Sequence, residues 1–149
     1  MNIVIIGKSG QLAFELSREL ENSEHQVSFL GRDDIDITSA SNIEETLSPL
    51  SAEVVINASA YTAVDKAEED QQSADLINHL AVGNLANVCN LLGILLIHIS
   101  TDYVFDGGSD RPYNEQDQLN PLGYYGLSKL NGEQAIQLSG CKHIIIRTA

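Results

Sequence analysis

The alternation of short apolar runs with segments of helical periodicity limits the folds open to this chain more than any other feature. Five runs rich in Ile, Leu and Val are bounded by polar residues or glycine. Continuous apolar runs of this kind are typical of strands that are covered on both faces of a sheet. The runs lie at 3–6, 27–30, 54–56, 94–99 and 143–146.

Apolar residues between the runs recur at the spacing of amphipathic helices. Strands that alternate with helices predict a parallel sheet, and right-handed crossovers place the helices on both of its faces. The sequence therefore predicts an α/β fold, a doubly wound parallel sheet of the Rossmann type. The helical stripes fall at 12–20, 43–47, 76–92 and 127–138.

The composition is that of a globular domain, and the net charge limits the kinds of partner that it can bind. The chain has 149 residues, of which 43% are hydrophobic and 19% charged, and this excludes a disordered chain, a collagen and a coiled coil. The formal net charge of −13 argues against nonspecific binding to nucleic acids or anionic membranes, because phosphate surfaces attract basic proteins. It still allows a small anionic ligand held by backbone amides. We expect one domain over 1–149.

The sequence predicts a cytoplasmic protein without a metal site in this chain. No run approaches the roughly 20 apolar residues of a membrane span, and the chain enters its first apolar run without a basic leader region. Cys89 and Cys141 belong to no Cys-x-x-Cys motif and are expected as free thiols in a reducing compartment. The four histidines lack metal-ligand spacing, and His98, within an apolar run, is expected as a satisfied core group.

A glycine-containing turn, GKSGQLA at 7–13, connects the first apolar run to the first helical stripe. Gly7 permits a tight turn, and Gly10 lets the backbone approach a pyrophosphate that the free N–H groups of the helix would bind. The spacing is GxxGxxA rather than GxGxxG, with Ala13 as the small residue for packing the helix on the strand. The position between strand and helix predicts a dinucleotide-binding turn.

The residues after the second run indicate which dinucleotide the turn accepts. An acidic residue there accepts the ribose 2′-hydroxyl of NAD, whereas an arginine pairs with the 2′-phosphate of NADP. Gly31 and Arg32 occupy this place, which favours NADPH. Asp33 and Asp34 follow at once, so the use of NADH stays open.

Tyr125 and Lys129 form a Tyr-x-x-x-Lys motif in the last helical segment. Positions i and i+4 share a helix face, and a nearby ammonium would lower the pKa of Tyr125 and make it a usable proton donor or acceptor. Thr101 follows the fourth run, where ligands bind in open α/β sheets, although hydroxyl residues also cap strand ends. The longest non-periodic stretch, 107–122, is typical of a functional loop.

Five sequence blocks in chain order indicate a known family. They are GxxGQL at 7–12, DIT at 36–38, NASAYTAVDKAE at 57–68, STDYVFDG at 100–107 and NPLxxYGxSKxxGE at 120–133. Together they resemble the dTDP-4-dehydrorhamnose reductase family of extended short-chain dehydrogenases/reductases. The resemblance implies hydride transfer from NAD(P)H to the C4 ketone of dTDP-4-dehydro-L-rhamnose, a step that supplies dTDP-L-rhamnose for bacterial surface polysaccharides.

The resemblance also implies a role for each matching residue. Thr101, Tyr125 and Lys129 match the catalytic triad, and Thr101 and Asp102 match substrate contacts. Glu15 matches a residue that in some members helps to bind Mg²⁺ at a homodimer interface, whose other ligands would lie beyond this chain. The residues expected to contact the cofactor are Gly7, Gly10, Gln11, Leu12, Arg32, Asp36, Ile37, Ala58, Ala60, Tyr61, Thr62, Tyr125 and Lys129.

The match ends about halfway through the family's chain, so the smaller substrate-binding half is expected to lie outside these residues. Ala13 stands where many members have glycine. Two other functions stay open. One is an NADP-binding regulatory subunit similar to that of methionine adenosyltransferase. The other is a nucleotide-sugar epimerase or dehydratase, for which Asp102 would be the extra acidic residue. The intact set of Thr101, Tyr125 and Lys129 favours an enzyme over a regulatory subunit, and the surrounding blocks favour the reductase over an epimerase or dehydratase.

Overall fold

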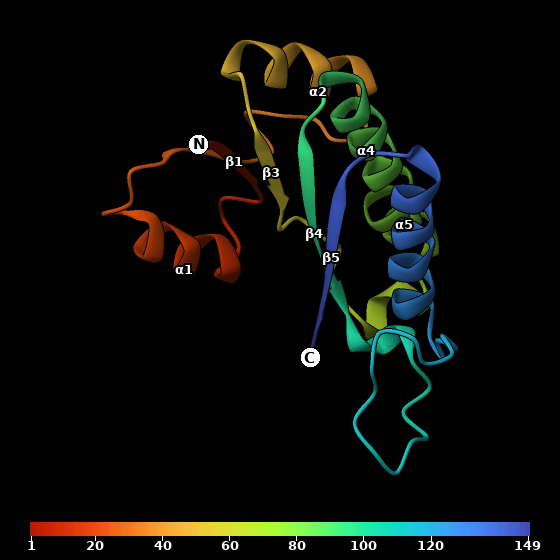
Figure 1. Ribbon diagram of the computed structural model, residues 1–149. Helices are drawn as coiled ribbons and strands as arrows, with labels where there is room; N and C mark the ends of the chain where they lie inside the picture. Colours follow the sequence, from red (N-terminus) through yellow and green to blue (C-terminus); the bar gives the residue numbers. More distant parts are fainter.

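The computed structural model describes residues 1–149 and contains a five-stranded parallel sheet with helices on both faces (Figure 1). The strand order is β2-β1-β3-β4-β5, and every neighbouring pair is parallel. The predicted doubly wound sheet is therefore confirmed. The strands are β1 (Asn2–Ile6), β2 (Gln26–Leu30), β3 (Val54–Asn57), β4 (Leu95–Thr101) and β5 (His143–Thr148).

The helices divide unequally between the two faces of the sheet. Only α1 (Gln11–Leu20) covers one face, whereas α2 (Ala40–Leu47), α4 (Ala81–Leu92) and α5 (Tyr124–Ser139) cover the other (Figure 1). Figure 1 shows α4 and α5 side by side along β4 and β5. Shorter elements complete the chain: η1 (Ser48–Leu50), η2 (Asp65–Glu68), α3 (Gln71–Asp75), η3 (Leu76–Leu80) and η4 (Asp102–Val104).

The side chains of β1 show why the strand sequences are continuously apolar. Successive residues of a strand point to opposite faces. Ile3 and Ile5 enter the small core beneath α1, while Val4 and Ile6 enter the large core beneath α2, α4 and α5. A strand that is buried on both faces therefore has no position for a polar side chain.

Two elements differ from the sequence-based prediction. The fourth strand continues to Thr101 instead of ending at 99, because β5 pairs with it as far as Thr148. The stripe at 76–92 is not one α-helix, since its first turn, η3, is π-helical. Such turns are rare and occur mostly where one extra residue is accommodated in a helix. None of the helices has the length and apolar content needed to cross a bilayer.

The strand order places the ligand-binding edge of the sheet. The chain passes from β1 to β2 on one side and returns to β3 on the other side of β1. In doubly wound sheets, such a reversal opens a crevice beyond the carboxyl ends of the strands. The turn after β1, the segment after β3, and η4 with the start of α5 all follow this edge.

Candidate functional site

Gly7 makes the tight turn that its sequence position predicts. Its φ is +105°, and a Cβ atom there would lie 2.9 Å from the backbone carbonyl carbon of Ala58. The N–H of Gly7 donates to the carbonyl of Leu30 at 2.8 Å, and the N–H of Ala58 donates to the carbonyl of Ile6 at 2.9 Å. Only glycine fits between these strand ends, because any side chain would collide with the backbone after β3.

The start of α1 presents unpaired backbone donors next to this turn. Gly10 is the N-cap residue, and it is extended and has no side chain to cap the helix. Gln11 and Leu12 begin the helix and are exposed, and the first turn contains no acidic residue. The first N–H groups of a helix lack partners within it and carry the positive end of its dipole. This arrangement suits the pyrophosphate of a dinucleotide.

Arg32 is an exposed cation beside the same turn, and it makes no hydrogen bond or ion pair. The acidic neighbour Asp34 is already engaged, because its carboxylate accepts from Lys8 Nζ at 2.5 Å and from the Gly31 N–H at 2.8 Å. The hydrogen bond with Lys8 is the main reason that the pKa of Asp34 is lowered. Arg32 is therefore free to meet a ligand, as is the exposed carboxylate of Asp33, whereas Asp34 is held by Lys8.

Asp36 and Ile37, expected to contact the adenine, lie between β2 and α2. The Asp36 carboxylate accepts from the N–H and the hydroxyl of Thr38 at 2.9 and 2.7 Å. The hydroxyl bond is the largest cause of the lowered pKa of Asp36. Ile37 packs partly against the large core. This loop is thus held in place by its own side chains, with Asp36 exposed.

Asn78 holds the segment after β3, and the sequence analysis missed it. Its Oδ1 accepts from the Tyr61 N–H at 2.9 Å, and its Nδ2 donates to the Tyr61 carbonyl at 3.0 Å. Nδ2 also lies 3.0 Å from Ser128 Oγ of α5. The side chain, 1% exposed, therefore ties Tyr61, and with it Ala58, Ala60 and Thr62, to the helix that carries Tyr125. A buried asparagine within an apolar helical stripe was the available signal.

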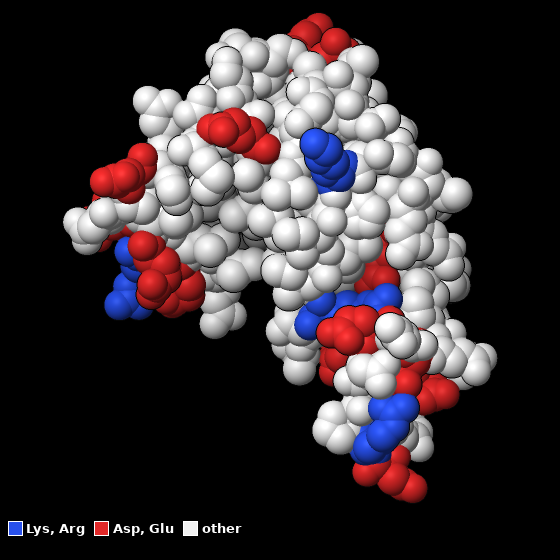
Figure 2. All heavy atoms as spheres, viewed as in Figure 1, with Lys and Arg blue, Asp and Glu red and all other residues white.

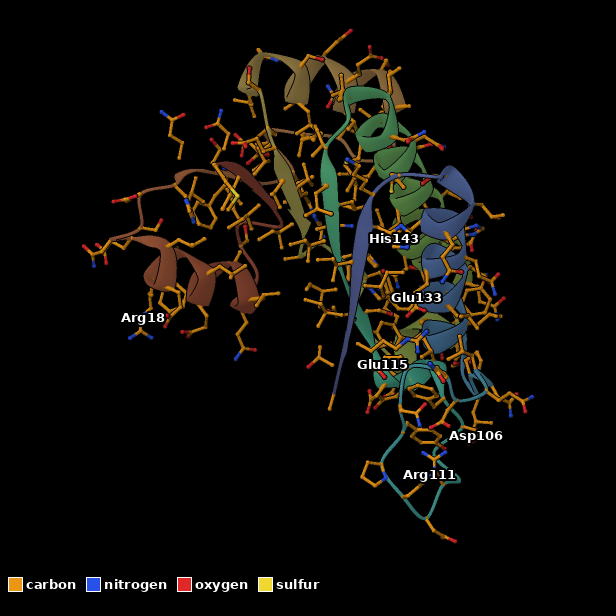
Figure 3. The ribbon with its side chains drawn as sticks, viewed as in Figure 1. Arg18, Asp106, Arg111, Glu115, Glu133 and His143 are labelled. Atoms are coloured by element: carbon orange, nitrogen blue, oxygen red, sulfur yellow. The ribbon has the colours of Figure 1, made fainter.

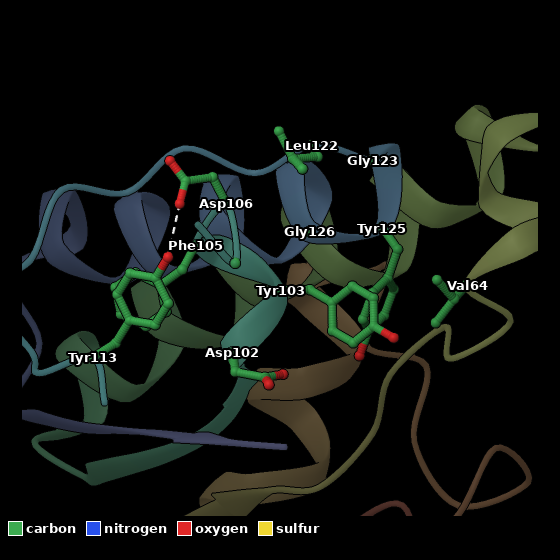
Figure 4. Close-up of a pocket in the computed structure, with 11 residues that line it drawn as sticks. Val64, Asp102, Tyr103, Phe105, Asp106, Tyr113, Leu122, Gly123, Tyr125 and Gly126 are labelled. Atoms are coloured by element: carbon green, nitrogen blue, oxygen red, sulfur yellow. Dashed lines mark hydrogen bonds between the residues drawn. The ribbon is translucent and has the colours of Figure 1, made fainter. Parts of the chain in front are cut away.

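A pocket of about 440 Å³ opens at the carboxyl end of β4 (Figure 4). The rings of Tyr103 and Tyr125 meet in it edge to face, with their centroids 5.7 Å apart. Figure 2 shows the molecular surface hollowed between the α1 side and the long loop. The pocket is lined by Val64, Asp102, Tyr103, Phe105, Asp106, Gly107, Tyr113, Leu122, Gly123, Tyr125 and Gly126.

The close approach of α5 to η4 brings Tyr125 to Thr101. A Cβ atom at Gly126 would lie 2.2 Å from the carbonyl oxygen of Tyr103, so the first turn of α5 lies directly on η4. Thr101 is 6% exposed, and its hydroxyl donates to Asp102 Oδ1 and accepts from the Tyr103 N–H, both at 3.2 Å. The predicted site residues Thr101, Asp102 and Tyr125 are thus adjacent.

Lys129 is the site residue whose surroundings differ most from expectation. Its side chain is almost fully buried, and Nζ donates to the Ile99 carbonyl at 2.6 Å and lies 3.4 Å from His98 Nε2. Burial lowers the pKa of Lys129 to about 8. The prediction that Lys129 lowers the pKa of Tyr125 is wrong in this structure, because burial of the phenol raises it, against a smaller lowering by Thr101.

A buried carboxylate anchors the base of the pocket. Glu133 accepts from Ser100 Oγ at 2.5 Å and from Nε and a terminal nitrogen of Arg147 at 3.0 and 2.7 Å. Figure 3 shows Glu133 between α5 and β5. The Arg147 guanidinium lies 5.3 Å from the ring centroid of Phe105, which stacks on Tyr113 at 4.3 Å. The sequence blocks included Glu133 but assigned it no role.

The long loop predicted at 107–122 forms the outer wall of the pocket. Tyr113 donates its hydroxyl to Asp106 Oδ1 at 2.7 Å (Figure 4). Farther along the loop, Arg111 pairs with Asp117 at 2.7 Å. Figure 3 labels Arg111 near the tip of this loop. Internal contacts of this kind give the loop a defined shape without regular secondary structure.

Two further expectations concern groups away from the pocket. His98 is fully buried and hydrogen-bonds Asn57 at 3.1 Å, which confirms it as a satisfied core group. Glu15 lies exposed on α1 and pairs with Arg18 at 3.2 Å. The structure contains no group of three or more His, Cys, Asp or Glu residues that could hold a metal ion, so an Mg²⁺ site at Glu15 gains no support.

Comparisons with known proteins match the whole chain. The family described as the RmlD substrate binding domain matches residues 1–149. The dTDP-4-dehydrorhamnose reductases of Salmonella typhimurium and Escherichia coli K12 are 40% and 41% identical to the chain over 156 residues. Each alignment covers 100% of this chain and 51% of the relative. The chain therefore spans about half the length of these curated relatives.

Solved structures of similar proteins agree with the fold and the family. A dTDP-4-dehydrorhamnose reductase from Clostridium acetobutylicum superposes with a TM-score of 0.96 at 39% identity, over 100% of this chain and 53% of that one. One from Bacillus anthracis, in complex with NADP, gives 0.94 at 34% identity, over 97% of this chain and 52% of that one. With the family match over its full length, the chain belongs to the RmlD family.

Proposed function

We propose that the chain is the cofactor-binding and catalytic portion of an NAD(P)H-dependent nucleotide-sugar reductase, acting on the C4 ketone of dTDP-4-dehydro-L-rhamnose. One observation carries the proposal: an uncapped helix N-terminus and a Thr101–Tyr125 pair lie at the same edge of one sheet. Relatives that are 40% and 41% identical over the whole chain are named dTDP-4-dehydrorhamnose reductase. The proteins that carry this name are about twice as long as this chain. The half of those proteins that this chain does not match would supply further substrate contacts.

The residues at the β1–β3 reversal fit a nicotinamide dinucleotide. The backbone cradle at Gly7 and the free N–H groups of α1 would hold the pyrophosphate. The unpaired Arg32 would hold a 2′-phosphate, and Asp34, already bound by Lys8, is poorly placed to accept a 2′-hydroxyl. We therefore propose NADPH as the preferred form. When bound, the dihydronicotinamide supplies the hydride for C4.

Tyr125 would donate its phenolic proton to the oxygen that becomes negative as the ketone is reduced. The phenol is protonated at neutral pH and can serve as the acid, although burial raises its pKa and so makes it a weaker proton donor than an ordinary tyrosine. Positioned general acids contribute about 10²–10⁴-fold to rates. The Thr101 hydroxyl, now donating to Asp102, would turn to the keto oxygen. To hold the nicotinamide ribose, Lys129 would have to turn Nζ away from the Ile99 carbonyl and toward the pocket. This intact set favours an enzyme over a regulatory NADP-binding role, and the sequence blocks around it favour reduction over an epimerase or dehydratase reaction.

Cofactor binding is tested by titrating the chain with NADPH and NADH and following cofactor fluorescence. We expect saturable binding with NADPH the tighter ligand. Arg32→Ala is expected to weaken NADPH binding by about 10- to 100-fold, since a charge-assisted hydrogen bond contributes about 1.5–3 kcal/mol, and to leave NADH binding unchanged. Arg18→Ala, on the outer side of α1, is the control. Absence of saturable binding with either cofactor would contradict the proposal.

Turnover is tested after joining the chain to the C-terminal half of the Clostridium acetobutylicum reductase. Tyr125→Phe is expected to abolish reduction of dTDP-4-dehydro-L-rhamnose while the NADPH affinity stays the same. Tyr124→Phe, the neighbouring tyrosine of the same helical turn, is the matched control and should retain activity. Reduction by the Tyr125→Phe variant at the unsubstituted rate would exclude Tyr125 as the acid.

A further inference from the structure

A row of buried polar groups in hydrogen-bond contact runs from Ser59, after β3, through Asn57 and His98 to Lys129 on α5. Asn57 Oδ1 accepts from the N–H and the hydroxyl of Ser59 at 3.1 and 2.6 Å. Asn57 Nδ2 lies 3.1 Å from His98 Nδ1, and His98 Nε2 lies 3.4 Å from Lys129 Nζ. Asn57 and His98 are 0% exposed and Lys129 is 1% exposed, so these groups depend on one another for partners.

The backbone N–H of Ser59 fixes the direction of the hydrogen bonds that Asn57 makes, and with them the tautomer of a neutral His98. A backbone N–H can only donate, so the Asn57 atom facing the Ser59 N–H is the oxygen, and the amide nitrogen faces His98. The amide nitrogen also only donates, and His98 Nδ1 must therefore accept. In a neutral imidazole the other nitrogen then carries the hydrogen. His98 consequently presents an Nε2–H to Lys129.

The Lys129 amine completes the row. Nζ already donates to the Ile99 carbonyl at 2.6 Å. An uncharged amine can accept the Nε2–H with its lone pair, whereas an ammonium would oppose one donor with another. Burial acts in the same direction, since it lowers the pKa of Lys129 to about 8 and holds the pKa of His98 well below its usual value.

We propose that Asn57 and His98 are positioning residues that join the cofactor segment at Ser59 to Lys129, by holding His98 in the Nε2–H tautomer and offering that hydrogen to Nζ once the amine is uncharged. The functional part of this inference rests on the roles proposed above for Lys129 and the segment after β3. A change at Ser59 on cofactor binding would reach Lys129 through three successive hydrogen bonds, by way of Asn57 and His98.

Among the charged groups of α5 and of the elements packed against it, Glu133 is the one that shifts the pKa of Lys129. Glu133, one turn beyond Lys129, raises the pKa of the ammonium but is bound by Arg147 from β5. On α3 and η3, which pack against α5, Asp75 and His79 pair with each other at 2.9 Å. His98 is therefore the titratable group that touches Lys129 Nζ directly.

The tautomer of His98 is measurable by two-bond nitrogen–proton NMR correlations of the chain labelled with ¹⁵N-histidine. His98→Gln identifies its signals among those of the four histidines. We expect a hydrogen on Nε2 and none on Nδ1 at pH 9, where Lys129, with its pKa of about 8, is mostly uncharged. A hydrogen on Nδ1, in either the other neutral tautomer or the imidazolium, would overturn the proposal. This measurement needs no cofactor, so it stands even if the chain binds no NADPH.

Substitution of Asn57 tests whether this residue sets the tautomer. In Asn57→Asp a carboxylate faces His98 Nδ1, and we expect a hydrogen to appear on Nδ1. Ser59→Ala is the matched control, because the backbone N–H at 59 still orients Asn57, and it should leave the tautomer unchanged. An unchanged tautomer in folded Asn57→Asp would overturn the assigned role of Asn57. If that variant does not fold, the measurement on the unsubstituted chain still decides.

The link to Lys129 is tested by the pH dependence of its side-chain NMR signals and of NADPH affinity. Asn57→Asp is expected to move the Lys129 titration upward by ~1 pH unit, because Nε2 no longer opposes the ammonium and a negative charge is nearby. The pH at which NADPH affinity falls should move with it. A Lys129 titration identical in Asn57→Asp and the unsubstituted chain would overturn the coupling. Failure to bind NADPH at any pH would instead contradict the proposed function.

Discussion

The fold buries the ionisable side chain of Lys129. We therefore expect its protonation to make the free energy of unfolding depend on pH. Its pKa is about 8 in the folded state against the ordinary 10.5. Between these values the unfolded chain binds the proton more tightly, so the contribution of Lys129 to the free energy of unfolding rises with pH. Below pH 8 both states hold the proton, and the burial penalty on the ammonium is fully present.

Lys129→Met isolates this contribution, because other titrating groups, such as the buried Cys89 with its pKa raised to about 12, are common to both proteins. We expect the unsubstituted chain to gain about 1 kcal/mol on the variant between pH 8 and pH 9. Urea unfolding at each pH measures the difference. A difference that stays constant with pH would mean that Lys129 titrates normally.

Glu133 is a buried carboxylate whose partners come from two strands. It accepts two hydrogen bonds from Arg147 and one from Ser100. Glu133→Gln leaves the guanidinium without a counter-charge, and we expect a loss of about 3 kcal/mol in the free energy of unfolding. Glu15→Gln breaks the exposed pair with Arg18 and is expected to change stability little. Equal effects of the two substitutions in urea unfolding would show that Arg147 finds other partners.

The position of α5 depends on the absence of a side chain at Gly126. A methyl group there would meet the Tyr103 carbonyl oxygen at 2.2 Å, and neither backbone can yield without moving the helix from η4. We expect Gly126→Ala to cost about 2–3 kcal/mol, as overpacking does, and to weaken any ligand binding in the pocket. Gly83→Ala in α4 is the control, since its methyl group would lie 3.4 Å from Ala135 Cβ. Thermal unfolding that ranks the two variants alike would contradict this account.

The strands and α1 could be predicted from the sequence because local patterns determine them. The apolar run at 3–6 is continuous since both faces of β1 are buried, and Gly7 follows at the turn that requires it. The environment of Lys129 could not be predicted. Helical periodicity places it on the face of Tyr125, but only the docking of α5 on β4 decides that Nζ reaches Ile99 and His98.

The contacts of Asn78 likewise show that local sequence patterns predict a helix but not its long-range hydrogen bonds. The stripe at 76–92 predicts a helix there, and a helix forms. Its π-helical first turn carries an asparagine whose partners, Tyr61 and Ser128, lie in other elements. A hydrogen bond between residues so far apart in the chain leaves no periodic trace in the sequence. The site could thus be located from the sequence, while the residues that hold it in place could not.

The two faces of the sheet are covered unequally across the whole molecule. Ile144 and Ile146 on the edge strand β5 pair with Ile97 and Ile99 and share their face, which α1 covers only near β1. Both β5 residues are close to half exposed, at 48% and 46%. Parallel strands normally have both faces buried, and an exposed apolar edge strand favours association with another chain.

We therefore expect the isolated chain to self-associate as its concentration rises in sedimentation velocity. Association is expected to strengthen with ionic strength, because salt screens the repulsion between copies that each carry a net charge of −13. Ile146→Lys places a charge on the apolar edge and is expected to weaken association without unfolding the chain. Leu138→Lys, at an 88% exposed position on α5, is the matched control and should associate like the unsubstituted chain. A chain that stays monomeric at high salt would contradict this prediction. Screening of the charge repulsion would then not be enough to bring the uncovered faces of two copies together.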